Sequence, residues 1–220
     1  MKTFQEVPSK QAGVTLIELM IGLVVGLIVV SGAIYTFIIA FKSSRDVVYS
    51  ARLNQELAAI TTIIADDIRR AGHWVQSGAL SSPYDDMGED FNLVSASCAL
   101  YNYDVDGDGL IGTNEHSGVR FSASSIWVKT SGTSMTSCST GTWERLSDEN
   151  FMSVNAMSIT DSSLCIVNEA SAACPSNVGT NAVGSVREID ITITASVIND
   201  TDWTKTVQES VKIRNDFYAD

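Results

Sequence analysis

Two hydrophobic patterns follow each other in the N-terminal part of the chain. Residues 14–41 are almost entirely apolar, with neither a charge nor a proline from Leu19 to Phe41. As a helix that rises about 1.5 Å per residue, this charge-free run is roughly 35 Å long. The hydrocarbon core of a bilayer is about 30 Å thick. The pattern therefore predicts a membrane-spanning helix, in which Glu18 is the only charged residue.

The second pattern, over residues 42–72, is amphipathic. Apolar residues recur at spacings of three and four, which places them on one helical face; they are Leu53, Leu57, Ile60, Ile64 and Ile68. Arg69 and Arg70 suit the last turn of a helix, and Gly72 suits the position just past it. We predict one continuous helix over residues 14–71, about 87 Å long, whose second half is buried against its own head domain.

The remaining residues, 73–220, are rich in Ser, Thr, Gly, Asn and Asp and contain short β-branched runs. The clearest predicted strand covers residues 189–197, where apolar and polar residues alternate. A turn at 199–202 and a second strand with Val207, Val211 and Ile213 follow it. Further strands are predicted at 119–121, 125–129 and 151–159, and long loops at 73–119 and 161–186.

These elements predict an α+β fold. A long N-terminal α-helix, first transmembrane and then amphipathic, packs on an antiparallel β-sheet head. The length of 220 residues and the hydrophobic content of 45% suit one head domain plus a membrane segment.

The charge of the head excludes one class of partner. Residues 73–220 contain 7 Lys and Arg against 20 Asp and Glu. Phosphate groups would be repelled, so no nucleic-acid partner is expected. The two histidines, His73 and His116, lie in no recognisable nucleophile motif. The sequence therefore predicts a protein that is not an enzyme.

The residues around Gly13 are Gly13-Val14-Thr15-Leu16-Ile17-Glu18-Leu19, and they resemble the processing site of type IV pilins and pseudopilins. The resemblance implies that prepilin peptidase removes the leader, residues 1–13, by cutting between Gly13 and Val14. It implies N-methylation of the new N-terminus, where Val14 stands in place of the usual Phe. It also implies that Glu18 pairs with the terminal amine of a neighbouring subunit during assembly.

A second resemblance concerns the type of pilin. The stretch ADDIRRAG, residues 65–72, and an alternating C-terminal hairpin ending near Arg214-Asn215 resemble PilW-type minor pilins. The resemblance implies a role in priming type IV pilus assembly, with other minor and major pilins as partners. It implies a single pass through inner-membrane lipid and a periplasmic head that later reaches the pilus or cell surface.

Several alternatives stay open at this point. One is a J-type pseudopilin of type II secretion, which has the same architecture. Others are a membrane-anchored calcium-binding adhesion module and a membrane-tethered enzyme. A secretory signal peptide is disfavoured because its apolar core is shorter, about 7–15 residues.

The strongest motif in the head is DVDGDGLIGTNE, residues 104–115. It matches the twelve-residue EF-hand loop, in which alternating acids and a glutamate at position twelve bind Ca²⁺ and a glycine at position six permits the sharp turn of the loop. The predicted ligands are the carboxylates of Asp104, Asp106, Asp108 and Glu115 and the backbone carbonyl of Leu110. The flanking residues are poor helix formers, so we predict an isolated calcium loop between β-strands.

Four cysteines lie beyond the apolar segment: Cys98, Cys138, Cys165 and Cys174. No CxxC pair is present, which disfavours a zinc cluster. In an oxidising compartment they are expected to form disulfides. Three connectivities are possible, and the simplest pairs Cys98 with Cys138 and Cys165 with Cys174.

Overall fold

A computed structural model describes residues 13–75, 90–167, 170–173, 182–198 and 200–214. The leader, apart from Gly13, lies outside these residues. The chain divides into two compact units, residues 1–48 and residues 49–220. The second unit contains the last part of the helix together with all the strands.

The predicted long helix is present as α1, Leu16–Ile68, with 53 residues. It ends three residues earlier than the predicted Ala71, and a hydrogen-bonded turn leads from Ile68 to Gly72. Gly72 has a φ of +73°, a left-handed conformation that favours glycine. A Cβ at Gly72 would lie 2.6 Å from Oδ2 of Asp90, so the close approach also requires glycine there.

In the first unit the apolar helix has no contact with a core. All residues 13–45 are exposed, including Leu16 at 78% and Phe37 at 69%. Within the part of the chain that the structure describes, α1 is the one helix long and apolar enough to cross a membrane. The segment therefore offers its whole circumference to lipid or to other helices.

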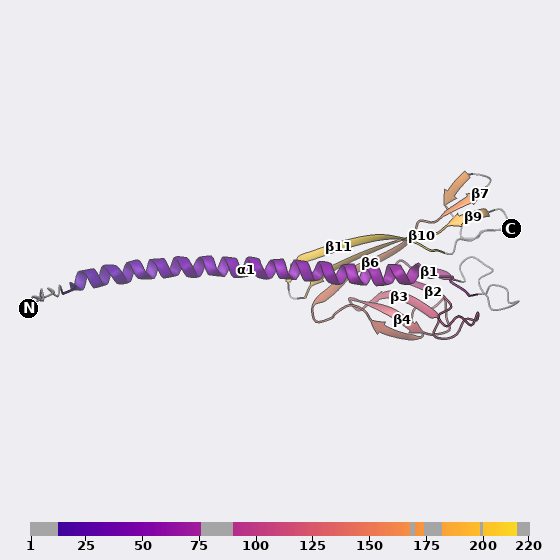
Figure 1. Cartoon of the computed structure of the whole chain (residues 1–220), viewed down its shortest axis with the longest axis horizontal. Coiled ribbons are helices and arrows are strands. Elements are labelled where there is room, and N and C mark those ends of the chain that lie inside the picture. The colour runs from indigo at the N-terminus through magenta and orange to yellow at the C-terminus, as the bar shows by residue number, and fades with distance from the viewer. Residues whose placement is uncertain (1–12, 76–89, 168–169, 174–181, 199, 215–220) are drawn as a thin grey trace, which may run out of the picture. The chain divides into compact units, whose positions relative to one another are not determined.

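The second unit contains three antiparallel sheets (Figure 1). The five-stranded sheet runs in chain order: β1 Phe91–Ser95, β2 Cys98–Asn102, β3 His116–Ser122, β4 Ser125–Ser131 and β5 Thr142–Arg145. A three-stranded sheet has the order β11 Asp200–Lys212, β10 Glu188–Val197 and β6 Met152–Asp161. The third sheet is small, with the order β8 Ala170–Ala173, β7 Leu164–Val167 and β9 Ala182–Val186.

The core of this unit joins the helix to the two larger sheets, in agreement with the predicted α+β fold. All five apolar residues of the predicted helical face are buried, with Leu57 and Ile68 at 0% exposure. They belong to one cluster that includes Val119 of β3 and the alternating isoleucines of β10. In Figure 1 strands of the two larger sheets lie along the C-terminal part of α1.

Two polar contacts fix the helix end to the strands. The Asp67 carboxylate accepts hydrogen bonds from Tyr101 (2.7 Å) and Tyr103 (2.9 Å). Beyond them, Asp90 forms a buried ion pair with Arg187, and the two residues are 5% and 7% exposed. This pair connects the residue before β1 to the residue before β10.

The predicted loops at 73–119 and 161–186 are wrong. The first contains β1, β2 and the start of β3, and the second contains β7, β8 and β9. All five residues of β2 are buried, so the strand lacks the alternation that marks a half-buried strand. The turn at 199–202 is also corrected, because β11 begins at Asp200, which pairs with Val197.

Candidate functional site

The N-terminal segment presents the predicted processing junction. Gly13, Val14 and Thr15 are exposed and not helical. The Thr15 carbonyl accepts the first helical bonds, from the N–H groups of Glu18 and Leu19, both at 3.2 Å. The bond between Gly13 and Val14 therefore lies in open backbone just before the helix.

Glu18 lies in the first turn of α1. A carboxylate at this end of a helix interacts favourably with the unpaired N–H groups and the helix dipole. The residues that follow it are apolar and exposed as far as Phe41. Glu18 is thus placed where a partner of opposite charge can reach it at the start of an otherwise apolar rod.

The acidic motif forms the connection between β2 and β3. Asn102, the last residue of β2, pairs with His116, the first residue of β3. The flanks are strands, as predicted. Carboxylate oxygens of Asp104, Asp106 and Asp108 all lie within 4.8 Å of one another. Gly109 has a φ of +78°, which agrees with its predicted place at the sharp turn.

Backbone N–H groups hold the three aspartates in this arrangement. Asp104 accepts from Gly107 at 2.6 Å and from Gly109 at 3.1 Å. Oδ1 of Asp106 accepts from the N–H of Asp108 at 3.2 Å. The loop therefore turns its own donors toward its carboxylates, which offsets part of their mutual repulsion.

Glu115 closes the loop. Its side chain is 1% exposed, and its oxygens accept hydrogen bonds from the N–H groups of Val105 (2.7 Å) and Gly112 (2.5 Å). The carboxylate oxygens of Glu115 do not belong to the cluster in which oxygens of the three aspartates lie within 4.8 Å of one another. The Leu110 side chain is 58% exposed, so Leu110 contributes no core packing to the loop.

Asp104 has an electrostatic environment of its own. Burial raises the pKa of its carboxyl, but hydrogen bonds from the N–H groups of Gly107, Val75 and Gly109 lower it and prevail. The pKa of Asp104 is thus held below its ordinary value. The site presents an ionised, buried carboxylate with two exposed carboxylates beside it.

The loop is also tied to the segment that leaves the helix, which sequence reasoning missed. The N–H of Asp104 donates to the carbonyl of His73 at 2.8 Å. Oδ2 of Asp104 accepts from the N–H of Val75 at 3.2 Å, and the Trp74 indole donates to the carbonyl of Gly109 at 3.0 Å. No sequence pattern signals this contact, because it depends on where the helix ends in space.

The disulfide between Cys98 and Cys138 is present, across a sequence separation of 40, as predicted. It holds residues 132–141 next to the five-stranded sheet, where Arg120 donates to the carbonyl of Cys138 at 2.7 Å. The predicted pairing of Cys165 with Cys174 lies outside the residues whose side chains the structure describes.

Comparison with known protein families decides what the chain is. Residues 46–213 match the family described as prepilin peptidase-dependent protein B. The chain belongs to the prepilin peptidase-dependent protein B family. Residues 8–34 also match the prokaryotic N-terminal methylation motif, a range that contains Gly13, Val14 and Glu18. No curated protein and no solved structure matches the chain.

Membership of the prepilin peptidase-dependent protein B family makes the protein type IV pilin-like. Processing by prepilin peptidase and partners of the pilin type accompany this assignment. Pilin-like families are structural, which confirms the prediction that the protein is not an enzyme. The exposed apolar helix and the methylation motif together suit anchoring in a membrane and assembly into a pilus or pseudopilus.

Proposed function

We propose that this protein is a PilW-type minor pilin that helps to prime type IV pilus assembly at the inner membrane. The observation that supports the proposal is the difference between the two parts of α1. Its first part is apolar and exposed with one carboxylate at Glu18, and its last part fills the core of the head. Such a helix can pack among the helices of other pilins while the head remains folded around its C-terminal end.

The proposed orientation rests partly on the resemblance to pilins. The leader carries Lys2, Lys10 and Glu6, and a positive segment before a span favours the cytoplasmic side, although Lys42 and Arg45 on the other flank of the span oppose this preference. The head is then periplasmic, and it reaches the cell surface only when the pilus extends. Other minor and major pilins are the proposed partners.

A J-type pseudopilin of type II secretion is the alternative with the same architecture. The stretch at residues 65–72 separates the chain from major pilins more than from J-type pseudopilins, so it does not decide between the two. Co-purification distinguishes the two, because the proposal requires other minor pilins rather than secretion-apparatus subunits to accompany the protein.

The processing prediction tests the proposal directly. The mature protein should begin at Val14, and its net charge should change from −12 to −13, since the leader has two lysines and one glutamate. Mass spectrometry of the N-terminal peptide, from cells with and without prepilin peptidase, measures the start and its methylation. Gly13→Leu should abolish cleavage.

Glu18→Ala is the matched control, because it leaves the junction unchanged. This variant should be cleaved normally but should co-purify less with other pilins, having lost the carboxylate that pairs with a terminal amine. A wild-type chain that still begins at Met1 in the presence of the peptidase would contradict the proposal.

We further propose that residues 104–115 bind one Ca²⁺. The arrangement of the donors supports this: three aspartate carboxylates already lie together, and Ca²⁺ takes six to eight oxygen ligands. Each carboxylate oxygen has two lone pairs, so the oxygens of Glu115 that accept one N–H each retain a second. Asp104, Asp106, Asp108, the Leu110 carbonyl and Glu115 would hold the ion.

Calcium should stabilise the folded chain. For an isolated loop we expect a Kd of roughly 10⁻⁴–10⁻³ M. At a hundred times the Kd, binding to the folded state alone adds about 2.7 kcal/mol. For a domain of this size that free energy corresponds to a rise in Tm of roughly 5–10 °C. Thermal unfolding of the full chain in detergent, with Ca²⁺ and with EGTA, measures the difference.

Asp106→Ala combined with Asp108→Ala should abolish this difference. Both side chains are exposed, whereas Asp104 accepts three backbone hydrogen bonds and its removal would destabilise the loop itself. Asp202→Ala, an exposed acid on β11, serves as the control and should keep the full response. Equal Tm values of the wild type in both buffers would refute the proposal.

A further inference from the structure

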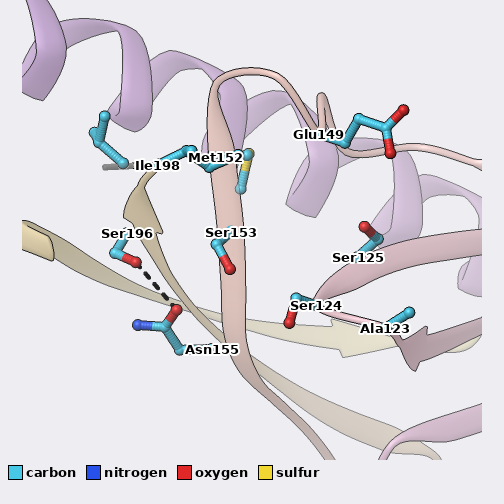
Figure 2. A pocket seen from close by; sticks show the side chains of 10 residues that line it. Ala123, Ser124, Ser125, Glu149, Met152, Ser153, Asn155, Ser196 and Ile198 are labelled. Atoms are coloured by element: carbon cyan, nitrogen blue, oxygen red, sulfur yellow. Dashed lines mark hydrogen bonds between the residues drawn. The ribbon is translucent and has the colours of Figure 1, made fainter. Parts of the chain in front are cut away.

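A cavity of about 460 Å³ lies where the turn between β3 and β4 meets the start of β6 and the end of β10 (Figure 2). This volume falls in the range of roughly 300–1,000 Å³ that is typical of small-molecule sites. The cavity has no part in the N-terminal segment or the acidic loop. Its polar lining comes from Ser124, Ser125, Ser153, Asn155, Ser196 and Glu149.

The turn that forms one wall has an unfavourable backbone conformation. Ala123 and Ser124 have φ values of 50° and 55°, in the left-handed region that costs L-residues about 1–2 kcal/mol each. Two-residue hairpin turns of this kind favour Asn-Gly. The turn is held in place because the carbonyl of Ser124 accepts a 2.9 Å hydrogen bond from the N–H of Val154. Ala123 and Ser124 thus place side chains at the cavity wall, at two positions whose backbone conformation would suit glycine better.

Half of the six polar side chains that line the cavity have no hydrogen-bond partner among the described residues. Ser196 donates to Oδ1 of Asn155 at 3.1 Å, as Figure 2 shows. Among the described residues, the hydroxyls of Ser124, Ser125 and Ser153 make no hydrogen bond to another group. Ser124 is exposed and Ser153 is half-buried, so these two hydroxyls are available to a ligand that enters the cavity. Ser125 is only 4% exposed.

The charges in the lining disfavour two ligand classes. Among the described residues, Glu149 is the one ionisable residue that lines the cavity, and it forms an ion pair with Arg145. Since no lysine, arginine or histidine of the described part of the chain lines the cavity, an anion would meet no positive charge there. A cation would have to compete with Arg145 for the only carboxylate. The lining suits an uncharged ligand.

Hydroxyl groups both donate and accept hydrogen bonds, so they match a ligand that also carries several hydroxyls. Beside them lies the half-buried side chain of Ile198, which can contact the C–H groups of such a ligand, whereas Met152 and Val197 of the lining are buried in the core. We propose that this cavity binds an uncharged polyhydroxylated ligand, namely a monosaccharide or the terminal sugar of a neutral glycan. The head would then contact a carbohydrate as well as other pilins.

The test uses the full chain in a detergent without a sugar headgroup. Glucose, galactose, mannose and N-acetylglucosamine are the probes, and saturation-transfer NMR with titration gives each Kd. We expect millimolar binding of at least one probe. Ser124→Gly and Ser153→Ala should each weaken it about threefold to tenfold, the effect of losing one hydrogen bond.

Ser124→Gly separates binding from folding. Glycine relieves the left-handed conformation, so this variant should melt at the same temperature as the wild type or higher while it binds more weakly. Ser158→Ala is the control, because Ser158 is an exposed serine of strand β6 outside the cavity lining, and this variant should bind as the wild type does.

Three results would overturn the proposal. One is the absence of binding for all four sugars. Another is equal affinity in the wild type, Ser124→Gly and Ser153→Ala. The third is a Ser153→Ala variant that no longer co-purifies with another pilin, together with a wild type that binds no sugar. This combination would show that the cavity is a protein–protein contact.

Discussion

Asp90→Ala should lower the free energy of unfolding by about 3–5 kcal/mol, because it leaves a buried guanidinium without its partner. Asp90 and Arg187 are both at least nine-tenths buried and pair with each other. Asp90 also packs against Gly72, where the chain leaves the helix. Its loss should therefore loosen the helix end as well. Chemical denaturation of the full chain in detergent measures the change.

Two further variants separate the buried charge from the lost contact. Asp90→Leu with Arg187→Met replaces the pair by apolar side chains and should recover most of the stability, since such replacements are often neutral or stabilising. Glu56→Ala removes a partner of Arg52 in an exposed helical pair at 3.0 Å and should cost less than about 1 kcal/mol. A loss in Asp90→Ala no larger than that in Glu56→Ala would contradict the assignment.

Leu57→Ala should cost about 2–5 kcal/mol, the range observed when a large buried aliphatic side chain is truncated. Leu57 is 0% exposed and belongs to the cluster that joins α1 to both larger sheets. The predicted loss reflects the cavity left among these side chains together with the lost transfer free energy. The same denaturation measurement detects it.

Ile63→Ala is the matched control for Leu57→Ala. Ile63 lies on the same helix, but its side chain is 49% exposed. Truncation there should change stability by roughly 0.5 kcal/mol or less. Equal losses in the two variants would show that the last part of α1 is not packed into the head as described.

These experiments also bear on how the head should be delimited. The compact unit begins at Tyr49, because the helix residues from Leu53 to Ile68 supply part of its core. A fragment that begins at His73 would lack these side chains. The amphipathic second half of α1 is a structural part of the head, whereas residues 13–45 of the apolar first half are all exposed.

Much of the local structure could be predicted from the sequence. The buried face of α1 follows from spacings of three and four, since a helix repeats every 3.6 residues. Strand β10 follows from strict alternation, since side chains of a strand point to opposite faces in turn. The acidic loop was recognised because its side chains lie close together along the chain, so their spacing already defines the motif.

Tertiary structure decided the features that join distant segments. Asp90 and Arg187 are 97 residues apart, and neither belongs to a periodic pattern that announces the pair. Strand β2 was missed because burial on both faces removes alternation, and the tie between Trp74 and Gly109 depends on where α1 ends. The cavity lined by Ser124, Ser125 and Ser153 forms only where the turn between β3 and β4 meets β6. Periodicity reports which face of an element is buried, but the contact between two elements depends on how the whole chain packs.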